Sequence, residues 1–401
     1  MNLHLMKNAI IVFFLILTFG TSMSAQVATI SQIDGVYMVI TNKYAPDKRT
    51  AILDLKFDVD IEKNLLTVTG ETNVPAALDE MRQMLYNYTI KDLVERLPSK
   101  SLNGYEFGVV TLSVANIRLK PFHPAELVTQ ALMGTPVTVL KEGEDNWFLV
   151  QTPEGYIGWV DDAGIQTFTK KEMDSWYKDD KLIFTDVYGF VYAEENEKGG
   201  TISDITAGGI LQLKSSTKNG YKVALPDGRE GYISKKSATP LKKWIKGLNP
   251  DPNDIIKTAK KFLGVPYLWG GTSPKGMDCS GFTKTVYFLN GILLARDASQ
   301  QCLYGEEVDV SSGYDKLKRG DLLFFGPKPQ EGKPQRITHV GIYMGNKEFI
   351  HAAGMVRINS FDSQSPIFSA YRTGMLVSAR RILTKLDSPG ILKLSIKNYI
   401  K

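Results

Sequence analysis

Cysteine and histidine are scarce in this chain of 401 residues. It holds two cysteines, Cys279 and Cys302, and four histidines, His4, His123, His339 and His351. Two cysteines exclude a framework stapled by several disulfides. A zinc site of four cysteines, or of two cysteines and two histidines, needs most of these residues close together, and their spacing does not offer it. We therefore predict no metal site and no cofactor.

The chain also lacks a strong bias of charge. Its formal net charge is +5 and it has no dense block of lysine and arginine, which argues against a nucleic-acid partner. Hydrophobic residues make up 43% and charged residues 23%, values that exclude a largely disordered chain. A usual domain has roughly 150 residues, so the length predicts two to four domains.

Long hydrophobic runs are absent too, and the one short run lies at the N-terminus. Lys7 precedes an apolar stretch at 9–20, which small or polar residues follow at 21–25. A run of about twelve residues is too short to cross a bilayer core of about 30 Å. The pattern predicts a signal peptide at 1–25, with a short membrane anchor as the alternative. We expect an exported protein, periplasmic or secreted, with no membrane anchor after cleavage.

The mature chain opens with mixed patterns at 26–107. Alternating apolar residues predict strands at 36–40, 51–59 and 65–69. Apolar residues at helical spacing predict a helix at 76–86. This part is expected to be a small α+β domain, and it offers no evident chemistry.

An internal repeat follows, in which residues 147–160 match residues 220–233. Each copy reads as strand, Pro-acid-Gly turn and strand, with a glycine before an aromatic residue. Short strands at this spacing predict two small barrels, at 108–166 and 183–238. These repeats resemble bacterial SH3-like domains. A role as structural spacers and a direct role in substrate binding are both open.

A cluster of prolines and polar residues at 241–252 predicts a linker, and the plausible chemistry lies after it. A helix capped by Asn253 is expected to run to Leu263, where Gly264 stops it. A loop rich in glycine and proline then leads to the first cysteine.

Cys279 begins a helical pattern that extends to residue 290. A helix N-terminus favours the thiolate through its dipole and unpaired N–H groups, so the pKa of this thiol is expected to fall. The neighbouring Asp278 opposes that fall, and the thiol therefore needs a histidine partner. The alternative is a buried structural cysteine.

Two histidines are available in a hairpin predicted at 337–352. A two-residue loop would put His339 and His351 on opposite faces. A three-residue loop at 345–347, or an equivalent bulge, puts both on one face and the apolar residues on the other. The hydrophobic pattern favours the second register. One cysteine and two histidines can also hold Zn²⁺, but the export signal and the helix-start thiol favour nucleophilic catalysis.

Four motifs carry a resemblance to a known family. They are DCSGF at 278–282, GDLL at 320–323, HVGI at 339–342 and FIHA at 349–352. Together they resemble the signature blocks of the NlpC/p60 cysteine peptidases, over residues 253–385. The resemblance implies a multidomain α+β protein: the small N-terminal α+β domain, two SH3-like β-barrels and a C-terminal papain-like α+β catalytic domain.

The resemblance also implies catalytic roles. Cys279 corresponds to the nucleophile, His339 to the general base and acid, and His351 to the residue that orients His339. The Tyr267 hydroxyl would donate to the oxyanion together with the backbone N–H of Cys279. These assignments agree with thiol catalysis, in which a histidine first takes the thiol proton and then gives it to the leaving amine.

Substrate contacts are implied by the same resemblance. Relatives with tandem barrels bind a free L-Ala ammonium through an Asp before the nucleophile and through an acid and a tyrosine of the first barrel; here these are Asp278, Glu126 and Tyr156. Arg296 and Asp297 resemble the segment that contacts the D-Glu carboxylate, with a surface ion pair as the alternative. Relatives often have a serine after that Asp, whereas this chain has Ala298. Trp269 and Ser280 are further candidates for substrate binding.

The leading hypothesis is a secreted cysteine peptidase that cuts the γ-D-Glu–L-diamino acid bond of peptidoglycan stem peptides. Its partners would be peptidoglycan-derived peptides with a free N-terminal L-Ala, so released fragments are favoured over intact wall. A non-catalytic wall-binding protein, and a cysteine amidase or acyltransferase on the same fold, are the alternatives. We expect Cys302 to be buried and reduced and His123 to lie on the surface. Neither is expected to take part in catalysis.

Overall fold

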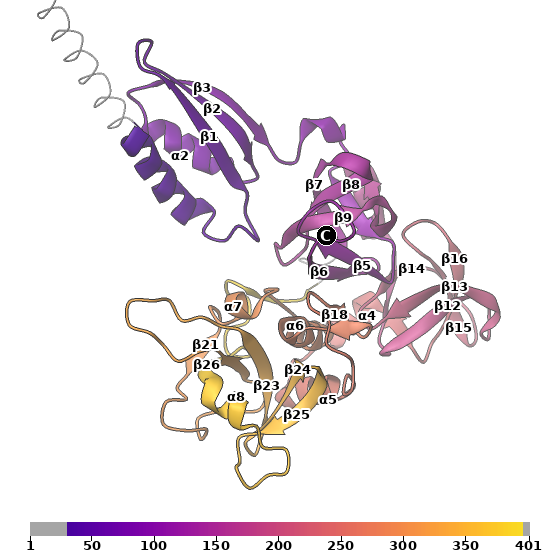
Figure 1. The fold of residues 1–401 in the computed structure, drawn as a ribbon. Helices are drawn as coiled ribbons and strands as arrows, with labels where there is room; N and C mark the ends of the chain where they lie inside the picture. The colour runs from indigo at the N-terminus through magenta and orange to yellow at the C-terminus, as the bar shows by residue number, and fades with distance from the viewer. Residues whose placement is uncertain (1–29, 396–401) are drawn as a thin grey trace, which may run out of the picture. The chain divides into compact units, whose positions relative to one another are not determined.

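The computed structural model describes residues 30–395, which form two units divided after Lys100 (Figure 1). The signal peptide expected at 1–25 lies outside the described residues. Among the helices that are described, none is long and apolar enough to cross a membrane.

The first unit packs helices against a three-stranded sheet. Residues 30–44 form a helix, although a strand is predicted at 36–40. That prediction is wrong because Ile33, Val36 and Ile40 recur at helical spacing and bury one face. In strand order β1-β2-β3, β1 and β2 are antiparallel, and α2 connects β2 to the parallel strand β3. The elements are β1 (Leu53–Asp60), β2 (Leu65–Thr72), α2 (Ala76–Met84) and β3 (Thr89–Arg96).

The second unit begins with the first SH3-like sheet, a seven-stranded antiparallel sheet. Its strand order is β10-β4-β7-β8-β9-β5-β6, and β10 and β6, at the two ends, are not paired with each other. The sheet is therefore open, which corrects the expectation of a closed barrel. Its strands are β4 (Phe107–Val110), β5 (Val114–Arg118), β6 (Leu127–Leu132), β7 (Pro136–Glu142), β8 (Trp147–Gln151), β9 (Ile157–Asp161) and β10 (Ile165–Phe168).

A helix, α3 (Lys170–Lys178), connects this sheet to the second SH3-like sheet. The second sheet is also open, in the order β13-β12-β16-β15-β14-β11-β17. Its strands are β11 (Lys181–Phe184), β12 (Tyr188–Glu194), β13 (Lys198–Thr206), β14 (Ile210–Ser216), β15 (Gly220–Ala224), β16 (Glu230–Ser234) and β17 (Ala238–Pro240). The two copies of the sequence repeat form the hairpins β8–β9 and β15–β16, as their strand-turn-strand pattern predicts.

The segment predicted as a linker contains a helix, α4 (Leu241–Gly247). Leu241 and Ile245 lie one helical turn apart and are both buried, so this part of the segment packs instead of spanning a gap. The following helix, α5 (Pro252–Lys260), is capped by Asp251 and not by Asn253. Proline suits the first helical position, so the helix begins at Pro252 and the residue before it, Asp251, is the cap.

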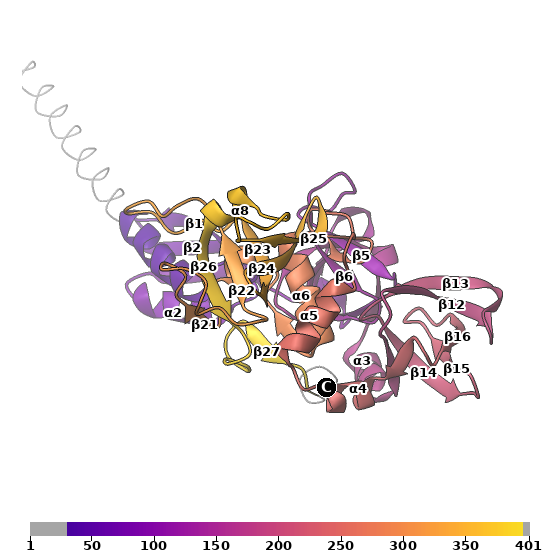
Figure 2. The same ribbon diagram turned by 90° about the horizontal axis from the view of Figure 1, so that it is seen from below.

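The C-terminal region places two helices against a six-stranded antiparallel sheet of order β21-β26-β22-β23-β24-β25. Figure 2 shows α5 beside α6, the helix that begins at Cys279. The remaining elements are β18 (Thr272–Ser273), β19 (Gly276–Met277), α6 (Cys279–Leu289), β20 (Ile292–Leu294), α7 (Ala298–Gln301), β21 (Glu306–Val308), β22 (Leu322–Phe325), β23 (His339–Gly345), β24 (Glu348–Ala353), β25 (Met355–Ser360), α8 (Ala370–Met375), β26 (Leu376–Arg381) and β27 (Ile391–Lys393).

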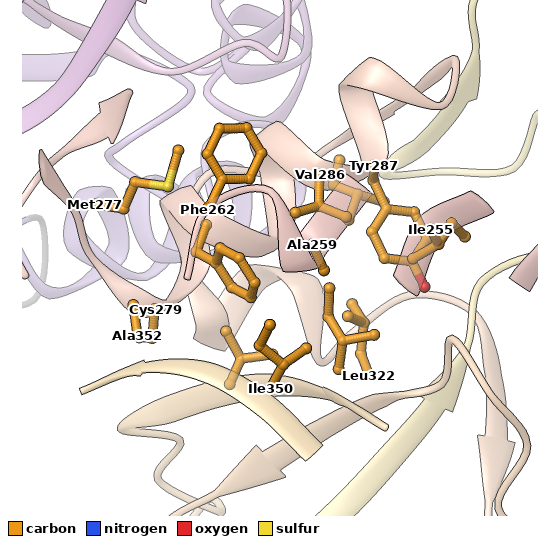
Figure 3. Close-up of a cluster of buried hydrophobic side chains, with 14 of the residues drawn as sticks. Ile255, Ala259, Phe262, Met277, Cys279, Val286, Tyr287, Leu322, Ile350 and Ala352 are labelled. Carbon is orange, nitrogen blue, oxygen red and sulfur yellow. The ribbon is translucent and has the colours of Figure 1, made fainter. Parts of the chain in front are cut away.

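One buried cluster holds these helices on the sheet. Phe262 of the turn after α5, Val286 of α6 and Ile350 of β24 are all fully buried in it (Figure 3). Cys279 belongs to the same cluster, beside Ala352. The nucleophile candidate is thus fixed at the margin of the main core and not on a mobile loop.

The β23–β24 hairpin has the predicted register. Ile342 pairs with Ile350 and Tyr343 with Phe349, and a bulge then leads into the turn. The bulge converts the three-residue loop into a two-residue turn without moving the strands. His339 and His351 therefore lie on one face, as the hydrophobic pattern indicates.

Candidate active site

Cys279 is the first residue of α6, and Asp278 caps that helix by accepting the Gly281 N–H at 2.6 Å. The approach to this cap is tight. A Cβ atom at Gly281 would lie 2.0 Å from the carbonyl oxygen of Gly271, so only glycine fits. The glycines in the loop and helix thus allow the chain to turn sharply into Cys279. Cys279 is 7% exposed.

The pKa of the Cys279 thiol is raised to about 11, contrary to the fall expected from its helix position. Burial is the main cause, and the negative charge of Asp278 adds to it. Hydrogen bonds from the backbone of Val340 and Ser280 act in the opposite direction but do not outweigh burial. The thiol is therefore neutral before substrate arrives.

The two histidines form a hydrogen-bonded chain with Asn359 of β25. Nε2 of His339 lies 2.7 Å from Nδ1 of His351, and Nε2 of His351 lies 2.9 Å from Oδ1 of Asn359. The Asn359 side chain is oriented because its amide nitrogen donates to the carbonyl oxygen of Ile367 at 3.0 Å.

This chain determines the tautomer of each ring. Since Oδ1 of Asn359 only accepts, His351 carries its proton on Nε2 and accepts on Nδ1. His339 then donates from Nε2, which leaves its Nδ1 as a proton acceptor. Burial lowers the pKa of His339 well below its ordinary value and that of His351 to about 4, so both rings are neutral.

Tyr267 is the candidate for the second oxyanion donor. Its pKa is raised to about 12, first by burial and then by the nearby Cys279 and Asp278. The hydroxyl is accordingly protonated and able to donate a hydrogen bond. Its backbone is fixed by a hydrogen bond to the Gly354 carbonyl at 2.9 Å, in the turn after β24.

Asp278, the residue before Cys279, forms a buried ion pair with Arg296. Nη2 of Arg296 lies 2.6 Å from the carboxylate, and its other nitrogens donate to Ser280 and to Thr129 of the first SH3-like sheet. Arg296 is 1% exposed, so the alternative of a surface ion pair is wrong. The structure does not support direct substrate contact by Arg296 or Ser280, since both lie below the surface with their polar groups in use.

The first SH3-like sheet supplies the other candidates. Nε1 of Trp269 donates to Glu126 at 2.8 Å, and the Tyr156 hydroxyl donates to Asp297 at 3.1 Å. These contacts join residues that are more than 140 positions apart in sequence. Trp269 is 63% exposed, so its ring remains open to a ligand. The structure thus brings Glu126 to the loop that precedes Cys279 and Tyr156 to the N-terminus of α7.

The remaining cysteine and histidine lie elsewhere. Cys302 is a free thiol, half-buried rather than fully buried as expected, and Arg380 donates to its backbone carbonyl. The His123 ring packs edge-on against Trp147, with 5.2 Å between centroids. Within residues 30–395, no group of three or more His, Cys, Asp or Glu side chains is arranged to hold a metal ion.

Comparison with known proteins shows that the C-terminal domain and the first SH3-like sheet both match known families. The profile of the NlpC/P60 family matches residues 264–380, and that of the bacterial dipeptidyl-peptidase SH3 domain matches residues 117–165. A γ-D-glutamyl-L-lysine dipeptidyl-peptidase of Bacillus cereus is 35% identical over 57% of this chain and 67% of its own length. The enzyme of that name from Bacillus subtilis is 33% identical over 56% of this chain and 71% of its own.

A solved structure agrees with these matches. The crystal structure of an NlpC/P60 family protein from Bacillus cereus superposes with a TM-score of 0.58 and 26% identity, over 69% of this chain and 99% of that one. The chain belongs to the NlpC/P60 family. It is a peptidase with SH3-like sheets ahead of its NlpC/P60 domain.

Two residues of the NlpC/P60 domain were not predicted from the sequence. Predicting the role of Asn359 requires the register of β25, in which Asn359 pairs with Phe349. No turn signal in the sequence determines that register. Arg372, in α8, influences both active-site imidazoles electrostatically. In the sequence, Arg372 is distinguished only by its position after the strand that carries His351. This signal is too weak to identify Arg372 without the fold.

Proposed function

We propose that this NlpC/P60 peptidase hydrolyses the γ-D-Glu–L-diamino acid bond of peptidoglycan stem peptides and releases L-Ala-γ-D-Glu from fragments with a free N-terminus. The observation that carries the proposal is the chain Asn359–His351–His339, which leaves a proton acceptor at Nδ1 of His339. The next residue, Val340, hydrogen-bonds the Cys279 thiol through its backbone. The names of the relatives, which state cleavage after γ-D-glutamate, support this choice of bond.

The proposed reaction starts from a neutral thiol and a neutral imidazole. As the Cys279 sulfur attacks the γ-carbonyl carbon, Nδ1 of His339 accepts the thiol proton. The oxyanion receives hydrogen bonds from the Cys279 backbone N–H and the Tyr267 hydroxyl. The protonated His339 then gives its proton to the leaving amine, and the C–N bond breaks to leave a thioester. Water, losing a proton to His339, hydrolyses the thioester and restores the thiol.

For the L-Ala ammonium, the charges around the site favour Glu126 over Asp278. The negative charge of Asp278 is balanced by Arg296 at 2.6 Å, whereas Glu126 accepts from a neutral indole and keeps its charge for a ligand. Tyr156 and Asp297 extend this acidic side of the site. An ammonium group bound here would place the L-Ala-γ-D-Glu part of the substrate between the first SH3-like sheet and the thiol.

Recognition of the L-Ala ammonium requires a free N-terminus. Released fragments have one, whereas stem peptides of the cross-linked wall lack it because they are attached through their L-Ala. We therefore propose that the substrates are short fragments. Export to the periplasm or the medium is part of this proposal, and the composition of residues 1–25 supports it.

The test compares L-Ala-γ-D-Glu-L-Lys with its N-acetylated form. Wild type is expected to release L-Ala-γ-D-Glu from the free peptide alone, and Cys279→Ala is expected to release none. Glu126→Gln should raise KM for the free peptide by about 10-fold or more, because a charge-assisted contact is lost. Glu144→Gln changes an exposed acid in the turn between β7 and β8, and as the matched control it should behave as wild type.

Each result has a distinct meaning. Equal cleavage of the acetylated peptide would overturn ammonium recognition but leave the peptidase activity. Cleavage by Cys279→Ala would overturn the assignment of the nucleophile. No cleavage of either peptide by wild type would overturn the proposed substrate.

A further inference from the structure

Arg372 places a cation beside the proposed reacting groups. Its guanidinium carbon lies 5.7 Å from the centroid of the Phe325 ring, and that ring lies 5.6 Å from the ring of His339. The guanidinium also covers the ring of Tyr371, at 5.2 Å. Arg372 is half-buried, so part of its hydration is lost in this position. The helix α8 thus holds a positive charge on the His339 side of the site.

This charge has no anionic partner within residues 30–395. The backbone N–H of Arg372 donates to the cap residue Ser369, but no hydrogen bond or ion pair to a described residue engages the guanidinium. Two buried or half-buried arginines of the same domain differ, since Arg296 pairs with Asp278 and Arg381 with Asp321. Holding a half-buried cation without a counter-charge is costly, and the two aromatic contacts offset only part of that cost.

In the proposed function, the leaving amine must come within hydrogen-bond reach of His339 to receive its proton. The acyl part of the substrate extends toward Glu126 and Tyr156. A group attached to the leaving amine therefore lies near His339, and the Phe325 ring that neighbours His339 also neighbours the guanidinium of Arg372.

We propose that Arg372 binds a carboxylate of the leaving diamino acid and so selects leaving groups that carry a negative charge near the cut bond. This inference rests on the proposed function. A guanidinium suits the task because its planar fork can bind a carboxylate through two hydrogen bonds. Two carboxylates fit: the C-terminal α-carboxylate of a tripeptide, and the side-chain carboxylate of diaminopimelate, which lysine lacks.

The experiment measures ratios of kcat/KM within each variant. Four peptides, L-Ala-γ-D-Glu followed by L-Lys or by meso-diaminopimelate, each with a free or an amidated α-carboxyl, separate the two carboxylates. In wild type, at least one carboxylate should raise kcat/KM by roughly 10- to 100-fold over the peptide without it. In Arg372→Gln that ratio should fall to near one, and Arg372→Lys should give an intermediate ratio.

A ratio within one variant cancels general losses of folding or catalysis, and residual cleavage of the neutral peptide shows that the variant is folded. Arg357→Gln is the matched control, because Arg357 is an exposed arginine that also acts on His351. It should keep the wild-type ratios. A wild-type ratio retained in Arg372→Gln would overturn the proposal, even if overall rates fell, since that result would assign Arg372 to the oxyanion.

One further substrate tests the acyl side. Replacing D-Glu with D-isoglutamine removes the D-Glu α-carboxylate and leaves the diamino acid unchanged. If Arg372→Gln abolished the preference for D-Glu over D-isoglutamine, while the diamino-acid ratios stayed as in wild type, the leaving-group assignment would be wrong. If wild type cut none of these peptides, the proposed function itself would fail.

Discussion

At the scale of single residues, burial determines the charge state of the proposed catalytic pair. Cys279 and His339 are 7% and 5% exposed, and each is pushed toward its neutral form. The helix N-terminus and the backbone donors favour a thiolate, but desolvation outweighs them. In the proposed mechanism, the pair therefore starts as a neutral thiol and a neutral imidazole, not as a preformed thiolate and imidazolium.

This neutral pair predicts the acid limb of the pH profile. Because the pKa of His339 is lowered, its Nδ1 stays unprotonated as the pH falls below the ordinary histidine value of 6.5. The acid limb of kcat/KM for L-Ala-γ-D-Glu-L-Lys should thus lie below that value, at the lowered pKa. An acid limb at or above the ordinary histidine pKa would contradict the burial argument.

The thiol gives an independent prediction. In a Cys302→Ser background, the rate of alkylation of Cys279 by iodoacetamide should rise through a pKa of about 11. An ordinary exposed cysteine titrates near about 8.5, and an activated one lower. Alkylation that is already maximal at neutral pH would show that the thiolate is preformed.

Asn359 acts through His351, so it is a positioning residue. Asn359→Leu removes the acceptor for Nε2 of His351, and the tautomer chain that leaves Nδ1 of His339 unprotonated is then no longer fixed. We expect kcat to fall roughly 100-fold, with KM little changed, because general base catalysis is impaired. Asn359→Gln, which keeps an amide oxygen, should restore part of the loss, and a KM effect alone would contradict this role.

At the scale of elements, the two SH3-like hairpins use the same turn differently. In the first, Glu154 of the Pro-Glu-Gly turn meets Lys284 of α6 at 2.8 Å, with side chains 4% and 14% exposed. In the second, the equivalent Asp227 pairs with Arg229 two residues later, on the surface. The first sheet is therefore docked on the catalytic helix by a buried ion pair, whereas the second turn is only locally paired.

This difference predicts unequal effects on stability. Lys284→Met leaves the Glu154 carboxylate buried without its partner and should lower the free energy of unfolding by about 3 kcal/mol. The double variant Glu154→Gln with Lys284→Met should recover much of that loss. Asp227→Asn, the matched control, should change stability by less than about 0.5 kcal/mol. Calorimetry on wild type and these three variants checks this, and a double variant no more stable than Lys284→Met would argue against the buried charge.

Local sequence patterns predicted the elements whose structure depends on residues close together in the sequence. The β23–β24 register follows from alternation and the turn, and the α6 start follows from Asp278 and the glycines. The helix at 30–44 was mistaken for a strand because its short apolar stretch fits both periods until the spacing of Ile33, Val36 and Ile40 is considered together. An open sheet and a closed barrel have the same strand-turn pattern, so the sequence could not separate them.

At the scale of the whole molecule, the proposed site draws on segments from Glu126 to Arg372. The proposed catalytic residues lie in one domain and within short motifs, so the sequence alone could nominate them. The burial of Arg296 could not, because it depends on Thr129, which lies 167 residues earlier in the first SH3-like sheet. Contacts of this kind exist only once the domains have packed together.

The residues assigned to the proposed site all lie after Ser101, and the first unit has a hydrophobic core of its own. A chain that begins at Ser101 should therefore retain the full-length activity on L-Ala-γ-D-Glu-L-Lys to within about 2-fold, measured as kcat/KM. In the full-length protein, Leu66→Ala, at a fully buried position of that core, should destabilise the first unit by about 2–5 kcal/mol. Calorimetry should show a lowered transition for that unit, and peptide cleavage should continue unchanged at temperatures above it. If activity fell by about 10-fold or more in both proteins, the first unit would have to support the site, and a loss in the shortened chain alone would indicate that residues after Ser101 need it for folding.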